Sequence, residues 1–174
     1  MHIQRLAAIA AAILACANPV AEPTADTTTV LVIRHAERAA VEGRDPPLSE
    51  AGAARAEALA EALADAGVTA IYATPYRRTR DTAAPLARRL GLEIRETPVQ
   101  GGVDVHAREV ARRVVAENPG GVVLVVGHSN TVPAIVGALT GLEVPEISED
   151  AYGDLFVVQA PTTGRARLIR ARIP

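Results

Sequence analysis

Two short apolar runs constrain the fold of this chain most strongly. They are residues 29–33 and 122–126, which consist almost wholly of valine, leucine and isoleucine without alternating polar residues. Strands of this kind are buried on both faces, as in parallel sheets that carry helices on either side. We therefore expect both runs at the centre of one sheet, with helices packed on its two faces.

The rest of the chain alternates between patterns of helix and strand. Ser49 and Thr74 suit helix N-caps, Gly91 suits the left-handed residue that ends a helix, and Pro85 predicts a kink. The expected helices are residues 49–66, 74–90, 105–118 and 131–139, and the further strands are residues 68–73, 92–97, 154–159 and 165–173, the last two as a hairpin. This alternation predicts a three-layer α/β/α sandwich with a mostly parallel central sheet and an antiparallel C-terminal edge.

The composition excludes several classes of function. The chain has 174 residues, of which 49% are hydrophobic and 22% charged, and a net charge of -2, so it is long enough for one core and carries no basic arm for nucleic acid. Aromatic residues make up 2%, too few for a base-stacking surface. All 18 basic residues are arginine, which excludes a lysine Schiff base, and Cys16 as the single cysteine excludes a disulfide framework. We expect no nucleic-acid partner.

The N-terminal segment has the features of a signal peptide. Its apolar run, residues 6–15, is shorter than the roughly 20 residues that span a bilayer. We expect residues 1–17 to be a signal peptide, residues 18–28 a tether and residues 29–174 the folded domain of an exported protein, whether periplasmic, envelope-anchored or extracellular. Cys16 leaves a lipoprotein signal open beside simple cleavage, and a lipid on this residue would be the protein's attachment to the membrane. An apolar N-terminal helix of a cytosolic protein is the third interpretation.

Histidines and arginines follow the predicted strands. The first apolar run continues into Arg34 and His35, the second leads to His128, and the helix after residues 68–73 carries Arg78 near its start. Because ligands in such sheets bind beyond the carboxyl ends of the strands, we expect these side chains to converge there. Arginine forks and helix N-termini bind phosphate oxygens, so the sequence predicts a cationic phosphate site that needs no metal and no cofactor.

Three segments resemble the motifs of the histidine phosphatase superfamily, which has the phosphoglycerate-mutase-like fold. Residues 31–37 end a strand with Arg-His-Ala-Glu, residues 74–82 are similar to the family's second segment, and residues 124–131 resemble the third, in which a strand delivers a second histidine. Thr74 and Asp81 replace the usual serine and glutamine of the second segment. Three motifs in the right order make the resemblance specific, and it is closest to the small phosphohistidine-phosphatase-like members.

The resemblance implies roles for the matching residues. His35 would be the nucleophile that carries the phosphoryl group before water releases it. Arg34, Arg78 and His128 would bind the phosphoryl oxygens and stabilise the charge of the transition state. Further contacts to the substrate are expected from Glu37 and Asn130.

A general acid is not evident from the motifs. Many members of the family carry a glutamate before the second histidine or an aspartate directly after it, and here Ser129 occupies the latter place. Asp104 and Glu96 are the nearest candidates, and we assign the role to Asp104 as the stronger of the two. A missing acid favours substrates with a good leaving group.

The expected function is that of an exported, metal-independent phosphatase. It would hydrolyse a phosphomonoester or phosphoramidate, on a small molecule or a phosphoprotein, through a phosphohistidine intermediate. The alternative is a non-catalytic phosphate-ligand binding protein on the same fold. A serine hydrolase fits poorly because no histidine follows Ser129, and a metal hydrolase built on His35, His106 and His128 fits poorly because these residues contain no short-spaced ligand pair.

Overall fold

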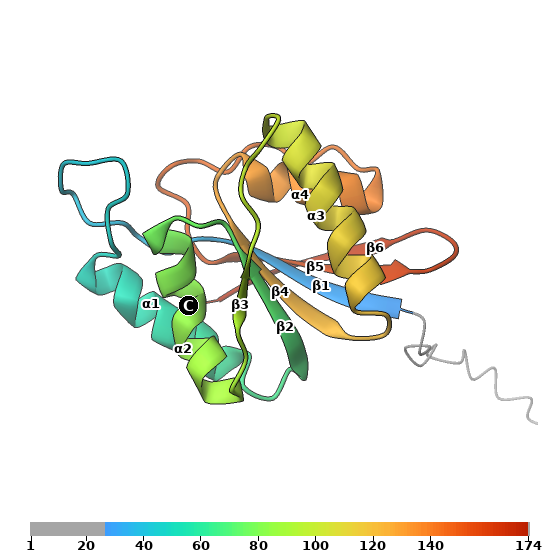
Figure 1. Cartoon of the computed structure of the whole chain (residues 1–174), viewed down its shortest axis with the longest axis horizontal. Coiled ribbons are helices and arrows are strands. Elements are labelled where there is room, and N and C mark those ends of the chain that lie inside the picture. Colours follow the sequence, from blue (N-terminus) through green and yellow to red (C-terminus); the bar gives the residue numbers. More distant parts are fainter. Residues whose placement is uncertain (1–26, 174) are drawn as a thin grey trace, which may run out of the picture.

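The computed structural model of the protein describes residues 27–173. The strands in this range are β1 (Thr27–Arg34), β2 (Val68–Ala73), β3 (Ile94–Glu96), β4 (Val122–Gly127), β5 (Asp154–Pro161) and β6 (Arg167–Arg172). The helices in the same range are α1 (Glu50–Ala62), α2 (Arg77–Leu90), α3 (Val103–Glu117) and α4 (Thr131–Thr140). The strands form one sheet in the order β3-β2-β4-β1-β5-β6, and the helices cover it (Figure 1).

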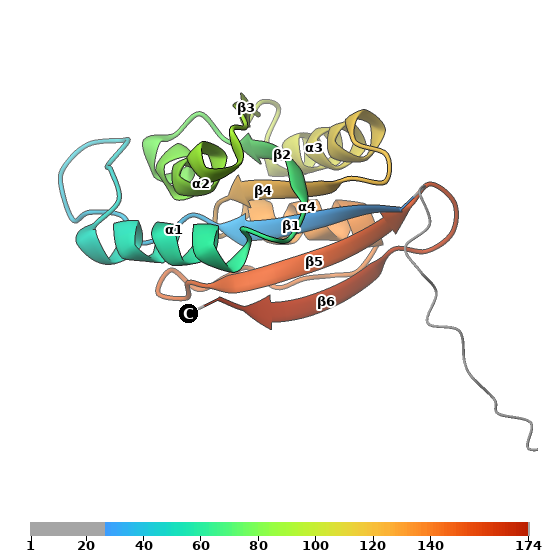
Figure 2. The same ribbon diagram turned by 90° about the horizontal axis from the view of Figure 1, so that it is seen from below.

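The sheet is parallel over four neighbouring strands and antiparallel at one edge. β1 pairs with β4, and β2 with β3 and β4, in parallel, whereas β5 runs antiparallel to both β1 and β6. In Figure 2 the arrowheads of β1 and β4 point the same way and that of β5 points the opposite way. The predicted α/β fold with a mostly parallel sheet and an antiparallel C-terminal edge is confirmed.

Successive residues of the central strands face different helix layers. Val30 and Val32 of β1 pack in one cluster with α3 and α4, whereas Leu31 and Ile33 pack in a second cluster with α1 and α2. The same division holds along β4. Figure 1 shows the two pairs of helices on opposite sides of the sheet. This two-sided burial explains why these strands are apolar at almost every position.

The starts of the first two helices differ in how well they follow the sequence signals. Ser49 is the N-cap of α1, and its Oγ accepts a hydrogen bond from the backbone N–H of Gly52 at 3.1 Å, as predicted. The prediction for α2 was wrong: this helix begins at Arg77 with Tyr76 as its N-cap, not at Thr74. The hydroxyl of Thr74 makes hydrogen bonds within the candidate site instead, so it does not cap the helix.

Several other boundaries are corrected by a few residues. α1 ends at Ala62, before the predicted 66. α2 continues through Pro85 to Leu90, and Gly91, with a φ of 66°, is the left-handed cap that the sequence predicts. The strand expected at residues 92–97 is shortened to β3, which lies at the sheet edge and pairs with β2 alone. α3 begins at Val103, two residues before the predicted start.

The N-terminal predictions fall largely outside the described residues. The expected signal peptide, residues 1–17, lies wholly outside them, and so does the expected tether up to residue 26. The end of the tether is corrected, because Thr27 and Thr28 already belong to β1. Thr28 is buried, and its Oγ1 donates a hydrogen bond to the carbonyl of Asn118 at 2.8 Å. Within residues 27–173, no helix combines the length and the apolar character needed to cross a membrane.

Candidate active site

Two of the predicted site residues, the histidines, lie side by side at the carboxyl ends of β1 and β4. The parallel register pairs Arg34 with Gly127, and the backbone N–H of His35 donates to the Gly127 carbonyl at 2.9 Å. The ring centroids of His35 and His128 are consequently 5.4 Å apart, with an interplanar angle of 67°. Glycine at position 127 leaves room for Thr131, because a Cβ there would lie 2.7 Å from Oγ1 of Thr131, which accepts a hydrogen bond from the backbone N–H of His128 at 2.8 Å.

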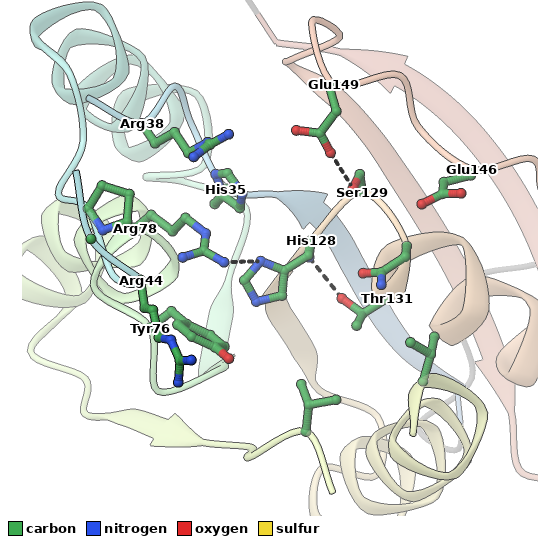
Figure 3. Close-up of a pocket in the computed structure, with 15 residues that line it drawn as sticks. His35, Arg38, Arg44, Tyr76, Arg78, His128, Ser129, Thr131, Glu146 and Glu149 are labelled. Carbon is green, nitrogen blue, oxygen red and sulfur yellow. Dashed lines mark hydrogen bonds between the residues drawn. The ribbon is translucent and has the colours of Figure 1, made fainter. Parts of the chain in front are cut away.

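Both imidazoles line a cavity of about 500 Å³ (Figure 3). Figure 3 shows Arg38, Arg44 and Arg78 on one side of the histidines, and Glu146 and Glu149 on the other. The further lining residues are Gly43, Pro46, Tyr76, Val99, Val103, Ser129, Asn130 and Thr131. The cavity therefore has a cationic wall that suits a phosphate and an acidic wall facing it. Of the predicted site residues, the structure brings His35, Arg78, His128 and Asn130 into this cavity.

His35 is held in the protonation state that a nucleophile needs. Its Nδ1 lies 2.7 Å from the carbonyl oxygen of Ala36, and because a carbonyl only accepts, Nδ1 carries the proton and Nε2 carries a free lone pair. Burial lowers the pKa of His35 to about 4, and the positive charges of Arg78 and Arg34 add to this effect. The imidazole is therefore neutral near pH 7, with Nε2 available for attack.

His128 has the opposite tautomer. A guanidinium nitrogen, Nη2 of Arg78, lies 3.4 Å from Nδ1 of His128 and only donates, so Nδ1 is the acceptor and Nε2 carries the proton. Nε2 in turn donates to Oγ1 of Thr74 at 2.9 Å, and the Thr74 hydroxyl lies 2.9 Å from that of Thr79. Burial lowers the pKa of His128 to about 3, and the charges of Arg78 and His35 lower it further, by smaller amounts. Both imidazoles are therefore neutral in the free protein near pH 7.

Arg78 reaches the cavity from the first turn of α2. Its guanidinium carbon lies 4.5 Å from the ring centroid of Tyr76, and the Tyr76 ring in turn stands edge-on to His128. Its Nη1 is 3.9 Å from Oδ1 of Asp45. Arg77, its neighbour in the chain, donates its backbone N–H to Asp45 at 2.8 Å and does not line the cavity. The structure thus favours Arg78 as the phosphate ligand.

Arg34 does not line the cavity. Its Nη1 donates to the carbonyls of Ser148, Glu149 and Ala151 at 2.7, 3.0 and 3.0 Å, and its Nη2 donates to the carboxylate of Glu149 at 3.3 Å. Its guanidinium carbon also lies 4.4 Å from the ring centroid of Tyr152. Within residues 27–173, Nε of Arg34 is the one buried side-chain nitrogen or oxygen without a hydrogen-bond partner. This guanidinium therefore fixes the loop before β5 instead of reaching into the cavity.

Glu37 braces a loop and does not line the cavity. Its carboxylate accepts hydrogen bonds from Arg55 of α1, at 3.0 Å from Nε and 2.8 Å from Nη2, and this pairing lowers the pKa of Glu37. The carbonyl of Glu37 also lies close to α1, since a Cβ on Gly52 would be 2.1 Å from that oxygen. Glu37 thus fastens the chain after His35 to α1, and the expected substrate contact is not what the structure shows.

The two expected general acids also lie away from the cavity. Asp104 is in the first turn of α3 and lines an adjoining hollow, which shares Val103 and Asn130 with the cavity. Glu96 ends β3 and pairs with Arg80 at 3.3 Å, where both side chains are exposed. His106, the third histidine of the metal-hydrolase alternative, is buried on α3 and lines another hollow. Within residues 27–173, no three His, Cys, Asp or Glu residues are grouped as metal ligands.

Five charged or aromatic residues of the cavity were not predicted from the sequence. They are Arg38, Arg44, Tyr76, Glu146 and Glu149. Tyr76 lies inside the second family-like segment, and Arg38 directly follows the first. Their nearness to these motifs could have indicated that they belong to the site. Glu149 lies in the loop before β5, where the sequence contains no motif, and its place in the site depends on the tertiary fold.

Comparison with known sequences gives a match over part of the chain. Residues 30–99 match the family described as the histidine phosphatase superfamily, branch 1. The Uncharacterized protein Rv0525 of Mycobacterium tuberculosis (strain ATCC 25618 / H37Rv) is 42% identical over 79 residues, which make up 42% of this chain and 39% of that protein. The matched region therefore spans well under half of this relative.

Solved structures share the fold over most of the chain. The native structure of mycobacterial glucosyl-3-phosphoglycerate phosphatase Rv2419c is similar with a TM-score of 0.69 and 20% identity, covering 85% of this chain and 100% of that one. The protein histidine phosphatase SixA, complexed with tungstate, gives a TM-score of 0.68 at 19% identity over 83% of this chain and 96% of its own. Bacillus stearothermophilus YhfR gives a TM-score of 0.67 at 18% identity, over 81% of this chain and 95% of its own.

The family match and the shared fold agree with the motifs that carry the two histidines. Residues 30–99 thus match the histidine phosphatase superfamily, and the fold of the described residues is the one seen in phosphatases of known structure, in agreement with the sequence resemblance.

Proposed function

We propose that this protein is a phosphatase that hydrolyses a phosphomonoester or phosphoramidate through a phosphohistidine on His35, without a metal ion. The observation that carries the proposal is the state of His35, whose Nδ1 is tied to the Ala36 carbonyl while Nε2 is unprotonated in a cavity shared with Arg78 and His128. Glucosyl-3-phosphoglycerate phosphatase Rv2419c and the protein histidine phosphatase SixA, which have the same fold, support a phosphoryl-transfer function.

The first step transfers the phosphoryl group to the protein. The lone pair of His35 Nε2 forms a bond to phosphorus, and the bond from phosphorus to the leaving oxygen or nitrogen breaks with its electron pair on the leaving group. Arg78, which lines the cavity, stabilises the charge on the phosphoryl oxygens. Nδ1 of His128 is an acceptor in the free protein, so it takes up a proton, from solvent or from a monoanionic phosphate, when it binds a phosphoryl oxygen.

The second step releases phosphate. A water oxygen forms a new bond to phosphorus and gives up a proton, which ends on solvent or on the released phosphate, while the bond from phosphorus to Nε2 of His35 breaks with its electron pair on Nε2. The Ala36 carbonyl holds Nδ1–H throughout, so the ring keeps the same orientation in both steps. Dividing one difficult displacement into two easier ones is the advantage of a covalent intermediate.

The test is hydrolysis of p-nitrophenyl phosphate by the full chain, with and without EDTA. We expect turnover that resists EDTA, that is lost in His35→Ala, and that persists in His106→Gln, a control that removes a buried imidazole outside the cavity. Loss of activity in EDTA would refute metal independence. Binding of inorganic phosphate without turnover of any phosphorylated substrate would instead establish the non-catalytic binding protein.

We also propose that the protein is exported through residues 1–17. The support is the sequence pattern of a short apolar run followed by small residues. Expression of the full chain in a bacterial host, followed by fractionation and intact-mass measurement, tests it. Export requires a shortened mature chain in the envelope or medium. A lipid on Cys16 requires an added acyl mass that Cys16→Ser abolishes.

A further inference from the structure

Two carboxylates line the cavity, and one of them is held by the residues next to the two histidines. Glu149 accepts a hydrogen bond from Ser129 Oγ at 3.0 Å, and Arg34 Nη2 donates to its other carboxylate oxygen at 3.3 Å. Arg34 directly precedes His35 in the chain, and Ser129 directly follows His128. The carboxylate is thus fixed from both strand ends that position the imidazoles. Figure 3 shows it beside Ser129.

The loop that carries Glu149 is fastened along its backbone as well. Arg34 Nη1 binds three of its carbonyls, and the backbone N–H of Ile147 donates to the Ser129 carbonyl at 3.1 Å. These bonds do not involve the Glu149 side chain, so its replacement leaves the loop attached. The backbone therefore presents this carboxylate at a fixed place although 74% of the side chain is exposed to water.

Glu149 is ionised in the free protein. The hydrogen bond from Ser129 and the positive charge of Arg34 lower the pKa of Glu149, and Arg38 and His35 contribute in the same direction. An ionised carboxylate has no proton to give to a leaving group in the first chemical step. It is equipped to take a proton from water in the second step.

We propose that Glu149 is the general base that activates water for hydrolysis of the phosphohistidine on His35, in the proposed phosphatase reaction. As the water oxygen bonds to phosphorus, one water proton passes to the carboxylate of Glu149 and the bond from phosphorus to Nε2 breaks with its electron pair on His35. The proton then leaves Glu149 for solvent or for the released phosphate, which restores the carboxylate. The first step proceeds without an acid, so the substrate class is one with a good leaving group, such as a phosphoramidate or an aryl phosphate.

The other acidic residues near the site are less suited to this role. The carboxylate of Glu37 is bound by Arg55, and Asp104 lines the adjoining hollow and not the cavity itself. Glu146 does line the cavity, but the contacts to Ser129 and Arg34 belong to Glu149. The assignment thus depends on those two contacts.

The experiment compares the full wild-type chain with Glu149→Gln in rapid-mixing assays on p-nitrophenyl phosphate. Glu143→Gln is the matched control, because it removes one acidic charge from the same loop but lies beside the neighbouring hollow. In Glu149→Gln we expect a burst of p-nitrophenolate with an unchanged rate, followed by steady-state turnover slowed by about 100-fold. Intact-mass measurement after an alkaline quench should show the phosphorylated chain accumulating in this variant and not in the control.

Three results would overturn the assignment. They are unchanged turnover in Glu149→Gln, a burst that slows in parallel with turnover, and a loss that appears in Glu146→Gln instead. These leave the phosphatase itself intact, because the wild type still turns over. If the wild type neither turns over nor gains a phosphoryl group, the proposed function fails and the role of Glu149 fails with it. Slow product release is distinguished from slow hydrolysis because it leaves no phosphorylated chain.

Discussion

Acidification should destabilise this protein through His35, and the size of the effect follows from the structure. Burial sets the pKa of His35 at about 4 in the folded protein, against an ordinary value of 6.5. The unfolded chain therefore binds more protons than the folded one between these values, so stability is highest above about pH 6.5 and falls as the pH drops towards 4. Proton linkage gives a loss of about 2 kcal/mol between about pH 7 and about pH 5 from this group.

Urea unfolding of the wild type and of His35→Asn at both pH values measures this contribution. The substitution also changes packing, but that change is present at both pH values and cancels when the pH dependence of each protein is compared. We expect the wild type to lose about 2 kcal/mol more than the variant on acidification. Equal losses in the two proteins would mean that His35 titrates near its ordinary pKa when folded. That result would refute the argument that burial keeps the nucleophile neutral.

Other substitutions test single contacts of the site. Gly127→Ala should cost about 1–3 kcal/mol of unfolding free energy in urea titrations, because the new Cβ would meet Oγ1 of Thr131 at 2.7 Å; an unchanged midpoint would contradict this. Thr74→Val removes the acceptor for Nε2 of the second histidine, and steady-state assays should show kcat lowered about tenfold, the equivalent of one hydrogen bond. Arg78→Lys keeps the charge but loses the guanidinium fork, so kcat/KM should fall about tenfold or more, whereas kcat/KM of Arg77→Lys should stay near wild type. Equal losses in the two variants would refute the assignment of Arg78, and not Arg77, to the phosphoryl group.

The sequence predicts the parts of the fold and site that depend on continuous segments. The two apolar strands predict their central position because each residue has to pack on one helix layer or the other. His35 and His128 are predicted to converge because each directly follows the end of one of these strands, and the parallel register then brings the rings together. Arg78 is predicted because it lies near the start of a helix that begins at the same edge of the sheet.

The remaining features depend on contacts between distant segments. The direction of the Arg34 side chain is set by carbonyls more than a hundred residues away, in a loop without any motif. Glu37 was expected at the substrate because it lies within the first motif, but Arg55 on α1 binds its carboxylate. The acid assigned to Asp104 rested on nearness in sequence, whereas Glu149, one of the two carboxylates that line the cavity, lies in the loop between α4 and β5.

The division of the sheet between two cores has a consequence for how this site tolerates change. Leu124 and Val125 are neighbours in the chain, yet they pack in different clusters. Truncating either side chain should therefore weaken the packing of one helix layer on the sheet and leave the packing of the other layer unchanged. The cavity arginines come from segments on the α1 and α2 side, and the carboxylates from the loop after α4. Each wall of the cavity can therefore be rebuilt for a different substrate on its own layer, while the two imidazoles remain attached to strands that both layers hold in register.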